Sequence, residues 1–117
     1  MRHDESRIQA ACVRYFACRY RKLLPLFFSV PNGARVGETQ RIVLKAEGLR
    51  SGVSDMILLV PSAHHHALCL EFKTPQGRQS ETQKEFQLAA QEQGFRYEII
   101  RSLDQFIEVV DGYLKDR

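Results

Sequence analysis

The chain has 117 residues, of which 44% are hydrophobic and 26% charged, and its formal net charge is +3. This length suits one domain with one core, and no apolar run approaches the ~18 residues that a membrane-spanning helix needs. The first nine residues, MRHDESRIQ, are charged from the second position onward and lack the apolar segment of a secretory signal, so we expect a cytoplasmic protein.

The distribution of charged residues and of cysteines indicates which class of protein this chain belongs to. Residues 1–54 carry ten Lys or Arg against four Asp or Glu, a net charge of +6, whereas residues 55–117 carry seven against ten, a net charge of −3. A basic half beside an acidic half suits a protein that binds a polyanion and uses carboxylates for chemistry, although solvated helix faces would give the same totals. Cys12, Cys18 and Cys69 lack paired spacing, which indicates packing residues in a reducing compartment rather than disulfides or a zinc site.

The hydrophobic periodicity predicts eight elements. In chain order they are a helix over 4–23, a strand over 26–30, a short helix within 39–48, strands over 55–60 and 67–73, a helix over 80–94, a strand over 95–100 and a helix over 102–114. Asp4 is a candidate N-cap of the first helix, which Pro25 is expected to end. Ser80 with Gln83 forms a capping-box pattern, and Gly94 stands where that helix should close.

This order of elements predicts an α/β fold, in which helices flank a small mixed sheet, as a single domain over residues 1–117. The connection between the strands at 55–60 and 67–73 is short enough for an antiparallel hairpin. It contains three consecutive histidines, at 64–66. Neighbouring residues of an extended chain face opposite ways, so the three cannot all bind one ion, and we expect a surface loop.

Glu71 and Lys73 lie inside the apolar run of strand 67–73, where a buried strand normally excludes charge. Side chains alternate along a strand, so both charges point to one surface, opposite the side chains that pack the core. Asp55 begins the partner strand, and it lies opposite Glu71 or Lys73 on the same face if paired residue numbers have an even sum. The core-facing side chains are Leu68, Leu70 and Phe72.

Two neighbouring carboxylates repel each other, and a hard divalent cation relieves that repulsion by taking their oxygens as ligands. An adjacent lysine can then orient a water molecule and stabilise developing charge, which is what hydrolysis of a phosphodiester requires. The alternative is a cross-strand ion pair between Lys73 and one acid, worth less than ~1 kcal/mol if it is exposed. A Glu-x-Lys tripeptide alone does not distinguish these interpretations.

Several segments together resemble one known family. They are GVSD at 52–55, LEFKT at 70–74, GRQSETQ at 77–83 and the C-terminal run QGFRYEIIRSLDQFIEVVDGYL. They are similar to the VRR-NUC domain, the virus-type replication-repair branch of the PD-(D/E)xK nucleases, over essentially the whole chain. The resemblance implies a restriction-endonuclease-like core, in the order helix, strand, hairpin, helix, strand, helix, and a metal-dependent DNA nuclease. Ser54 stands where the superfamily's name has proline, which removes no ligand.

The resemblance also implies roles for individual residues. Asp55, Glu71 and Lys73 match the catalytic core, and Glu5 best matches an acid on the first helix that completes the metal site. Gln83 matches a glutamine that helps to position the lysine or a phosphate. The structural alternative for Glu5 is an acid in the first turn that suits the helix dipole, and the alternative for Gln83 is a side chain that only caps its helix. The implied ligands of Mg²⁺ or Mn²⁺ are Asp55, Glu71, Glu5 and Phe72.

Basic residues near these motifs are candidates for phosphate contacts, which position DNA without reading its sequence. They are Arg35, Arg41, Lys45, Arg50 and Arg78. No sequence-reading motif is evident, so we expect recognition of DNA shape and no contact with membranes. Small stand-alone relatives resemble homodimeric enzymes acting on four-way junctions, so the resemblance implies branched DNA, with a Holliday junction preferred, in a bacterial or phage-infected cell. A nuclease for flaps or single-strand ends, a non-catalytic DNA-binding module, and an interaction domain unrelated to nucleic acid are the alternatives.

Overall fold

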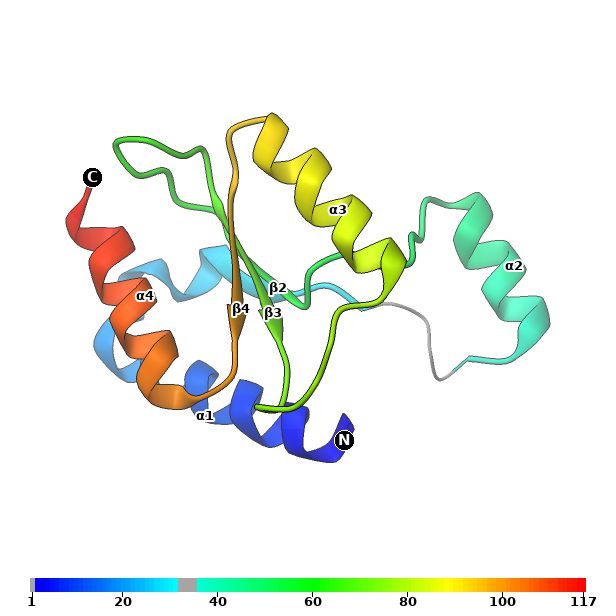
Figure 1. Ribbon diagram of the computed structural model, residues 1–117, viewed down its shortest axis with the longest axis horizontal. Coiled ribbons are helices and arrows are strands. Elements are labelled where there is room, and N and C mark those ends of the chain that lie inside the picture. Colours follow the sequence, from blue (N-terminus) through cyan, green and yellow to red (C-terminus); the bar gives the residue numbers. More distant parts are fainter. Residues whose placement is uncertain (1, 32–35) are drawn as a thin grey trace.

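A four-stranded mixed sheet in the order β1-β2-β3-β4 forms the centre of the molecule (Figure 1). The computed structural model describes residues 2–31 and 36–117. β1 pairs antiparallel with β2, β2 forms the predicted antiparallel hairpin with β3, and β3 pairs parallel with β4. The α/β mixed-sheet prediction is confirmed. The strands are β1 (Phe27–Ser29), β2 (Met56–Leu58), β3 (Leu68–Phe72) and β4 (Arg96–Ile100).

Helices cover both faces of the sheet. α1 and α4 pack on one face and α3 on the other, whereas α2 stands to the side of the sheet (Figure 1). The short helix expected within 39–48 is confirmed as α2, and none of the helices in the described part of the chain is long and apolar enough to cross a membrane. The helices are α1 (Arg2–Arg19), the 3₁₀ helix η1 (Arg21–Leu26), α2 (Glu38–Ala46), α3 (Glu81–Glu92) and α4 (Leu103–Lys115).

The main core lies between the sheet and the α1–α4 pair. Phe16 of α1 stacks against Phe27 of β1 with ring centroids 4.4 Å apart, and Phe27 in turn contacts Phe106 of α4 at 5.9 Å. Burial of each ring contributes roughly 1.5–3 kcal/mol, so these contacts are a principal attachment of the two helices. The hydroxyl of Tyr15 in α1 donates to Asp111 in α4 at 2.9 Å, which links the first helix to the last.

The second face is only partly covered. α3 packs through Phe86 and Ala90 against Cys69 and Tyr97 of β3 and β4. It leaves the neighbouring face of β2 open, where Leu59 directly after the strand is 53% exposed. The cysteines are free, and Cys12 and Cys69 are buried as expected of packing residues.

The ends of the helices differ from the sequence prediction in two places. The prediction of Asp4 as an N-cap is wrong, because α1 already begins at Arg2 and Asp4 lies in its first turn, where an acid still suits the helix dipole. The predicted helix over 4–23 is also too long: α1 ends at Arg19, Tyr20 leaves helical geometry, and Pro25 lies inside η1. At α3 the capping box of Ser80 is confirmed.

Candidate active site

Asp55, Glu71 and Lys73 come together where β2 begins and β3 ends. Met56 pairs with Leu70, so paired residue numbers have an even sum, and continuing the register by one residue places Asp55 opposite Glu71. The alternation of β3 is confirmed, since Phe72 lies in the α1–α4 core. The hairpin therefore sets the spacing of the three charged residues.

Asp55 is anchored to the main chain of β3. Its Oδ2 accepts a hydrogen bond from the backbone N–H of Phe72 at 2.6 Å, and its own carbonyl accepts from Val30 N at 2.8 Å. The carboxylate therefore occupies a place in the hydrogen-bond ladder just before β2 begins. The N–H and C=O of one strand residue point to the same side, so the Phe72 carbonyl also points toward this end of β2. The Phe72 side chain is in the core, so only this carbonyl could bind a metal.

Glu71 is buried rather than surface-exposed. The prediction that both charges face out of the sheet is wrong in this respect, because α3 covers this face; the Glu71 side chain is 1% exposed and that of Lys73 13%. Glu71 Oε1 accepts hydrogen bonds from Tyr97 Oη and from Gln79 Nε2, the latter at 3.0 Å. Oε2 has no hydrogen-bond partner among the described residues, and Lys73 Nζ lies 3.7 Å from it. The exposed cross-strand ion pair is therefore not what the structure contains.

The acids share one electrostatic environment. Burial is the largest influence on Asp55 and raises the pKa of its carboxyl, and the nearby carboxylates of Glu71 and Glu5 raise that pKa further. The Phe72 N–H and the Lys73 ammonium oppose this effect. The pKa of Tyr97 is raised well above its usual value, first by burial and then by Glu71, so its phenol stays a hydrogen-bond donor.

Glu5 approaches this region from the first turn of α1. It is partly buried, and with Asp4 it lines a hollow of about 570 Å³ whose other wall is the loop after β3. The loop is held by Arg101, whose Nη1 donates to the carbonyls of Thr74 at 2.7 Å and Gly77 at 2.8 Å. Arg101 thus fixes one wall of this hollow.

The carboxylates near Asp55 are ligands that a hard divalent cation prefers, although their side chains do not form a complete coordination site. Among residues 2–31 and 36–117, no three His, Cys, Asp or Glu side chains lie close enough to hold a metal ion. Glu71 Oε2 is buried without a hydrogen bond to the described residues, and the ionised form of Asp55 is disfavoured by burial and then by neighbouring carboxylates. A cation would satisfy both groups. Oxygen donors of this kind fit Mg²⁺ or Mn²⁺ better than zinc.

Gln83 serves as a helix cap. Its Oε1 accepts from Ser80 N at 2.7 Å, and its own N–H donates to Ser80 Oγ at 3.2 Å. The cap uses the carbonyl end of this side chain, so its amide Nε2 remains as a donor to a phosphate; it cannot donate to the Lys73 ammonium, which has no acceptor.

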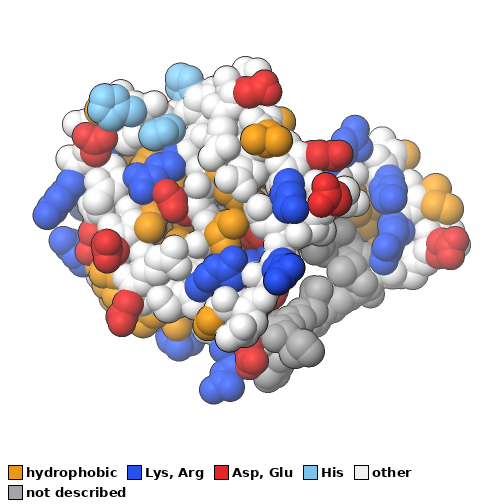
Figure 2. All heavy atoms as spheres, in the orientation of Figure 1, with side chains coloured by type: hydrophobic (Ala, Val, Ile, Leu, Met, Phe, Trp, Pro, Cys, Tyr) orange, Lys and Arg blue, Asp and Glu red, His pale blue; other side chains and the backbone are white. Residues whose placement is uncertain are grey.

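The structure separates the predicted phosphate contacts into two groups. Arg78 is exposed on the loop between β3 and α3, close in sequence to the acids. Arg41 and Lys45 lie on α2, where Figure 2 shows basic side chains, beside a hollow of about 510 Å³. Arg50, directly beyond α2, is exposed as well. Arg35 lies outside the described residues.

The backbone conformation and surroundings of Gly52 explain why the GVSD motif begins with glycine. Its φ is +82°, a conformation that favours glycine, and a Cβ at this position would lie 2.4 Å from the carbonyl oxygen of Thr82. The segment leading to Asp55 thus passes directly against the first turn of α3.

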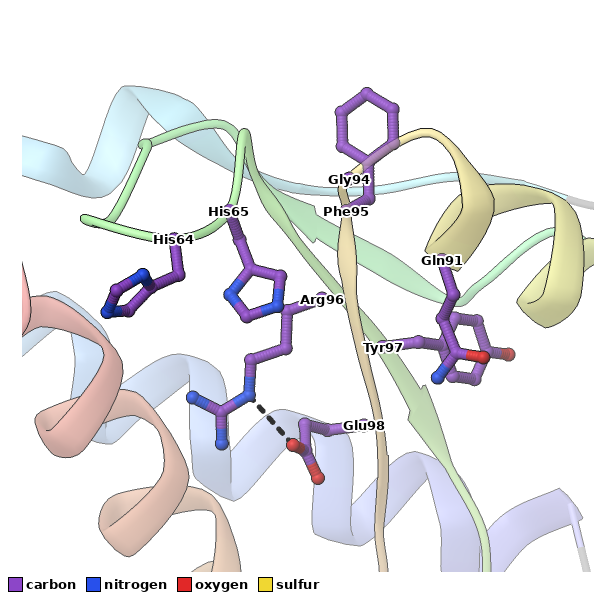
Figure 3. A pocket seen from close by; sticks show the side chains of 8 residues that line it. All are labelled: His64, His65, Gln91, Gly94, Phe95, Arg96, Tyr97 and Glu98. Carbon is purple, nitrogen blue, oxygen red and sulfur yellow. Dashed lines mark hydrogen bonds and ion pairs between the residues drawn. The ribbon is translucent and has the colours of Figure 1, made fainter.

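The histidine segment is the surface loop that was predicted. His64 and His66 are exposed, and His65 lines a shallow hollow with Arg96 and Glu98, which form an ion pair at 2.8 Å (Figure 3). The hollow is at the start of β4, whereas Glu71 is near the end of β3. Asp55, Glu71 and Lys73 do not line it, although Tyr97, which donates to Glu71, does.

Tyr97, Gln79 and Arg101 were not among the predicted site residues. Tyr97 is adjacent to the site only because β4 pairs parallel with β3, so that Cys69 lies opposite Tyr97. Gln79 lies eight residues after Glu71 in the loop before α3. The sequence signals were a tyrosine on a predicted strand and a glutamine beside a predicted helix cap, neither of which identifies a carboxylate partner.

Comparisons with known proteins agree on the family and the fold. A model of the VRR-NUC domain matches residues 4–104. Two chains of solved structures match, and one of them, a "VRR_NUC domain protein", superposes with a TM-score of 0.83 at 20% sequence identity, covering 96% of this chain and 88% of that chain. Among curated proteins there is no match. At this identity the structural likeness shows the fold alone.

Proposed function

The chain belongs to the VRR-NUC nuclease family, and from that premise we propose that it is a metal-dependent, structure-selective DNA endonuclease. The observation that carries the proposal is the Glu71 carboxylate, which is buried beside Asp55 and Lys73 with one oxygen free of hydrogen bonds to the described residues. A buried carboxylate oxygen without a hydrogen bond is costly, and a divalent cation beside Asp55 and Glu71 would satisfy it in addition to the charge of Lys73.

In this proposal Asp55, Glu71, Glu5 and the carbonyl of Phe72 hold Mg²⁺ or Mn²⁺. The ion, when bound, supplies positive charge that polarises the scissile phosphate and favours deprotonation of the attacking water. Lys73 orients that water and stabilises the charge that develops on the phosphate. The Nε2 of Gln83 donates to a phosphate oxygen.

We place DNA along the acidic opening between α1 and the loop after β3, with its backbone held by Arg78 and by the basic residues on and after α2. These contacts bind phosphates, so they support recognition of shape rather than sequence. Four-way junctions are the preferred substrate in this proposal, because a two-fold-symmetric junction offers two equivalent strands to a two-fold-symmetric dimer. The exposed apolar face at Phe28 and Leu59 supports such a dimer, since an apolar surface beside a sheet edge favours association.

The test of the chemistry is cleavage of labelled four-way junction, duplex, flap and single strand with Mg²⁺, Mn²⁺ or EDTA. Lys73→Ala and Glu71→Gln should each lower the rate by on the order of 10²–10³-fold while junction binding is retained. Glu71→Gln keeps an oxygen that accepts from Tyr97, so it removes charge without removing that contact. Lys84→Ala, at an exposed surface ion pair of α3, is the control and should cut normally.

Each outcome has a definite meaning. If Lys73→Ala or Glu71→Gln cleaved DNA at the wild-type rate, the assignment of the active site would be wrong. Metal-dependent cutting of flaps or ends, but not of junctions, would contradict the proposed substrate and would still support metal-dependent hydrolysis of DNA. Binding without cutting under any condition would identify a non-catalytic DNA-binding module. Sedimentation should give twice the 13.5 kDa mass of the chain, and a monomer at micromolar concentration would contradict the dimer.

A further inference from the structure

The two carboxylate oxygens of Glu71 have different surroundings. Oε1 accepts two hydrogen bonds, from Tyr97 Oη and from Gln79 Nε2 at 3.0 Å. Oε2 accepts none from the described residues and lies 3.7 Å from Lys73 Nζ. Hydrogen bonds from the protein therefore occupy Oε1 and leave Oε2 available to a ligand.

Both donors to Oε1 are themselves held in place. Tyr97 projects from β4 on the α3 face, where it is 6% exposed and its ring packs 6.0 Å from that of Phe86. The Gln79 amide also donates to Gln87 Oε1 of α3 at 2.8 Å, so its position is fixed by two acceptors. A rigid strand and a rigid helix thus both define where Oε1 lies.

The chemical type of these donors matters. A phenol and an amide are neutral, so they orient the carboxylate without cancelling its negative charge, as an arginine would do. A carboxylate held at one oxygen cannot rotate to exchange its oxygens, and it presents the other in a fixed direction. Groups that orient a ligand in this way typically change metal affinity by about 10–100-fold.

We propose that Tyr97 and Gln79 are positioning residues that hold Glu71 by Oε1 so that Oε2 alone is offered to the divalent cation. This inference rests on the proposed function. Neither residue contacts the reacting atoms. Their effect passes entirely through the direction and freedom of the Glu71 carboxylate. The competing explanation is that they only satisfy a buried charge and thereby stabilise the fold.

The test separates metal binding from folding and from catalysis. Mn²⁺ binding to the full chain is measured by calorimetry without DNA, and single-turnover cleavage is measured separately. Tyr97→Phe should weaken Mn²⁺ binding about tenfold and slow cleavage at least as much, with the KM for junction DNA unchanged. Gln79→Leu, which keeps the volume of the side chain and removes the donor, should act in the same direction.

Tyr113→Phe is the matched control. Tyr113 is another buried tyrosine, 1% exposed, whose hydroxyl donates to Val60 O at 2.7 Å within the α1–α4 core. Its loss should lower thermal stability without changing Mn²⁺ affinity or the cleavage rate. If Tyr97→Phe and Gln79→Leu lose stability only, as Tyr113→Phe does, the positioning role is wrong and the nuclease proposal stands. If the wild-type chain neither binds Mn²⁺ nor cuts DNA, the proposed function fails and the positioning role fails with it.

Discussion

Asp55 combines a structural contact with an unfavourable charge. Its carboxylate accepts the Phe72 N–H, which favours the ionised form, while burial and the acids Glu71 and Glu5 disfavour it more strongly, so its pKa is raised. A raised carboxyl pKa means that the folded state holds its proton more tightly than the unfolded state does. Without a cation, this group therefore lowers the stability of the fold increasingly as pH rises through the usual range of a carboxyl.

Asp55→Asn should therefore stabilise the metal-free protein. Asparagine keeps an oxygen to accept the Phe72 N–H and removes the charge, so we expect Tm in EDTA to rise by a few degrees. Addition of Mn²⁺ should raise the Tm of the wild type and not that of the variant. Differential scanning calorimetry measures both effects, and Asp104→Asn, at an exposed acid in the first turn of α4, is the control. A fall in Tm for Asp55→Asn would show that the negative charge of Asp55 stabilises the metal-free fold, which would contradict this prediction.

For individual residues, the sequence predicts that Asp55 and Glu71 meet, but it does not predict what surrounds them. The placement of Asp55 beside Glu71 needs only strand alternation and the hairpin register, both of which are local. The burial of Glu71 and its contact with Tyr97 depend on the pairing of β3 with β4 across α3, which no local pattern specifies. The prediction of an outward-facing pair was wrong because it did not include the helix that covers that face.

Among the described glycines, Gly52 makes the closest approach to a neighbouring element, the first turn of α3. The segment before Asp55 and the first turn of α3 touch through Gly52 and Thr82. The capping box of Ser80 fixes where that first turn begins. The position of Asp55 is thereby coupled to the start of the helix that covers Glu71.

Gly52→Ala should be costly. The new Cβ would lie 2.4 Å from a backbone oxygen and φ is +82°, so we expect a loss of about 2 kcal/mol or more in the free energy of unfolding. Cleavage should slow as well, because α3 and the loop to Asp55 must separate. Urea denaturation measures the first effect. Gly112→Ala in α4, whose Cβ would meet no described residue within 4 Å, should instead stabilise by ~0.5–1 kcal/mol.

Element types were predicted well and element ends less well. α3 has sequence signals at both ends, Ser80 with Gln83 and then Gly94, and its predicted and observed limits nearly coincide. The first helix ends early because Tyr20 leaves helical geometry and the chain continues as a 3₁₀ turn, which accommodates Pro25. No residue before Pro25 carries a strong stop signal.

For the molecule as a whole, the described Lys and Arg residues of the basic half lie in two places: on α1 and η1, which pack beside the sheet, and on and after α2, which stands off from it. α2 and the segment after it carry Arg41, Lys45 and Arg50, while the acids of the site lie against the sheet. A double change, Lys45→Ala with Arg50→Ala, should weaken binding to all DNA shapes alike and reduce the slope of log affinity against log salt by roughly 1 per lost phosphate contact. Fluorescence anisotropy across a salt series measures this. Lys115→Ala at the end of α4 should leave the slope unchanged, and preferential loss for one DNA shape would contradict a pure phosphate role.

The contact between α1 and α4 has a consequence for biosynthesis. Tyr15 and its acceptor Asp111 are separated by 96 positions, and β4 and α4 follow the acids along the chain. Contacts at such separation form late, because a long loop must close before they contribute. A nascent chain that has emerged from the ribosome as far as Lys73 carries every proposed acidic ligand but lacks Tyr97, α3 and the core residues of β4 and α4. The nuclease is therefore expected to stay inert during translation and to become active only when the last helix docks onto the first.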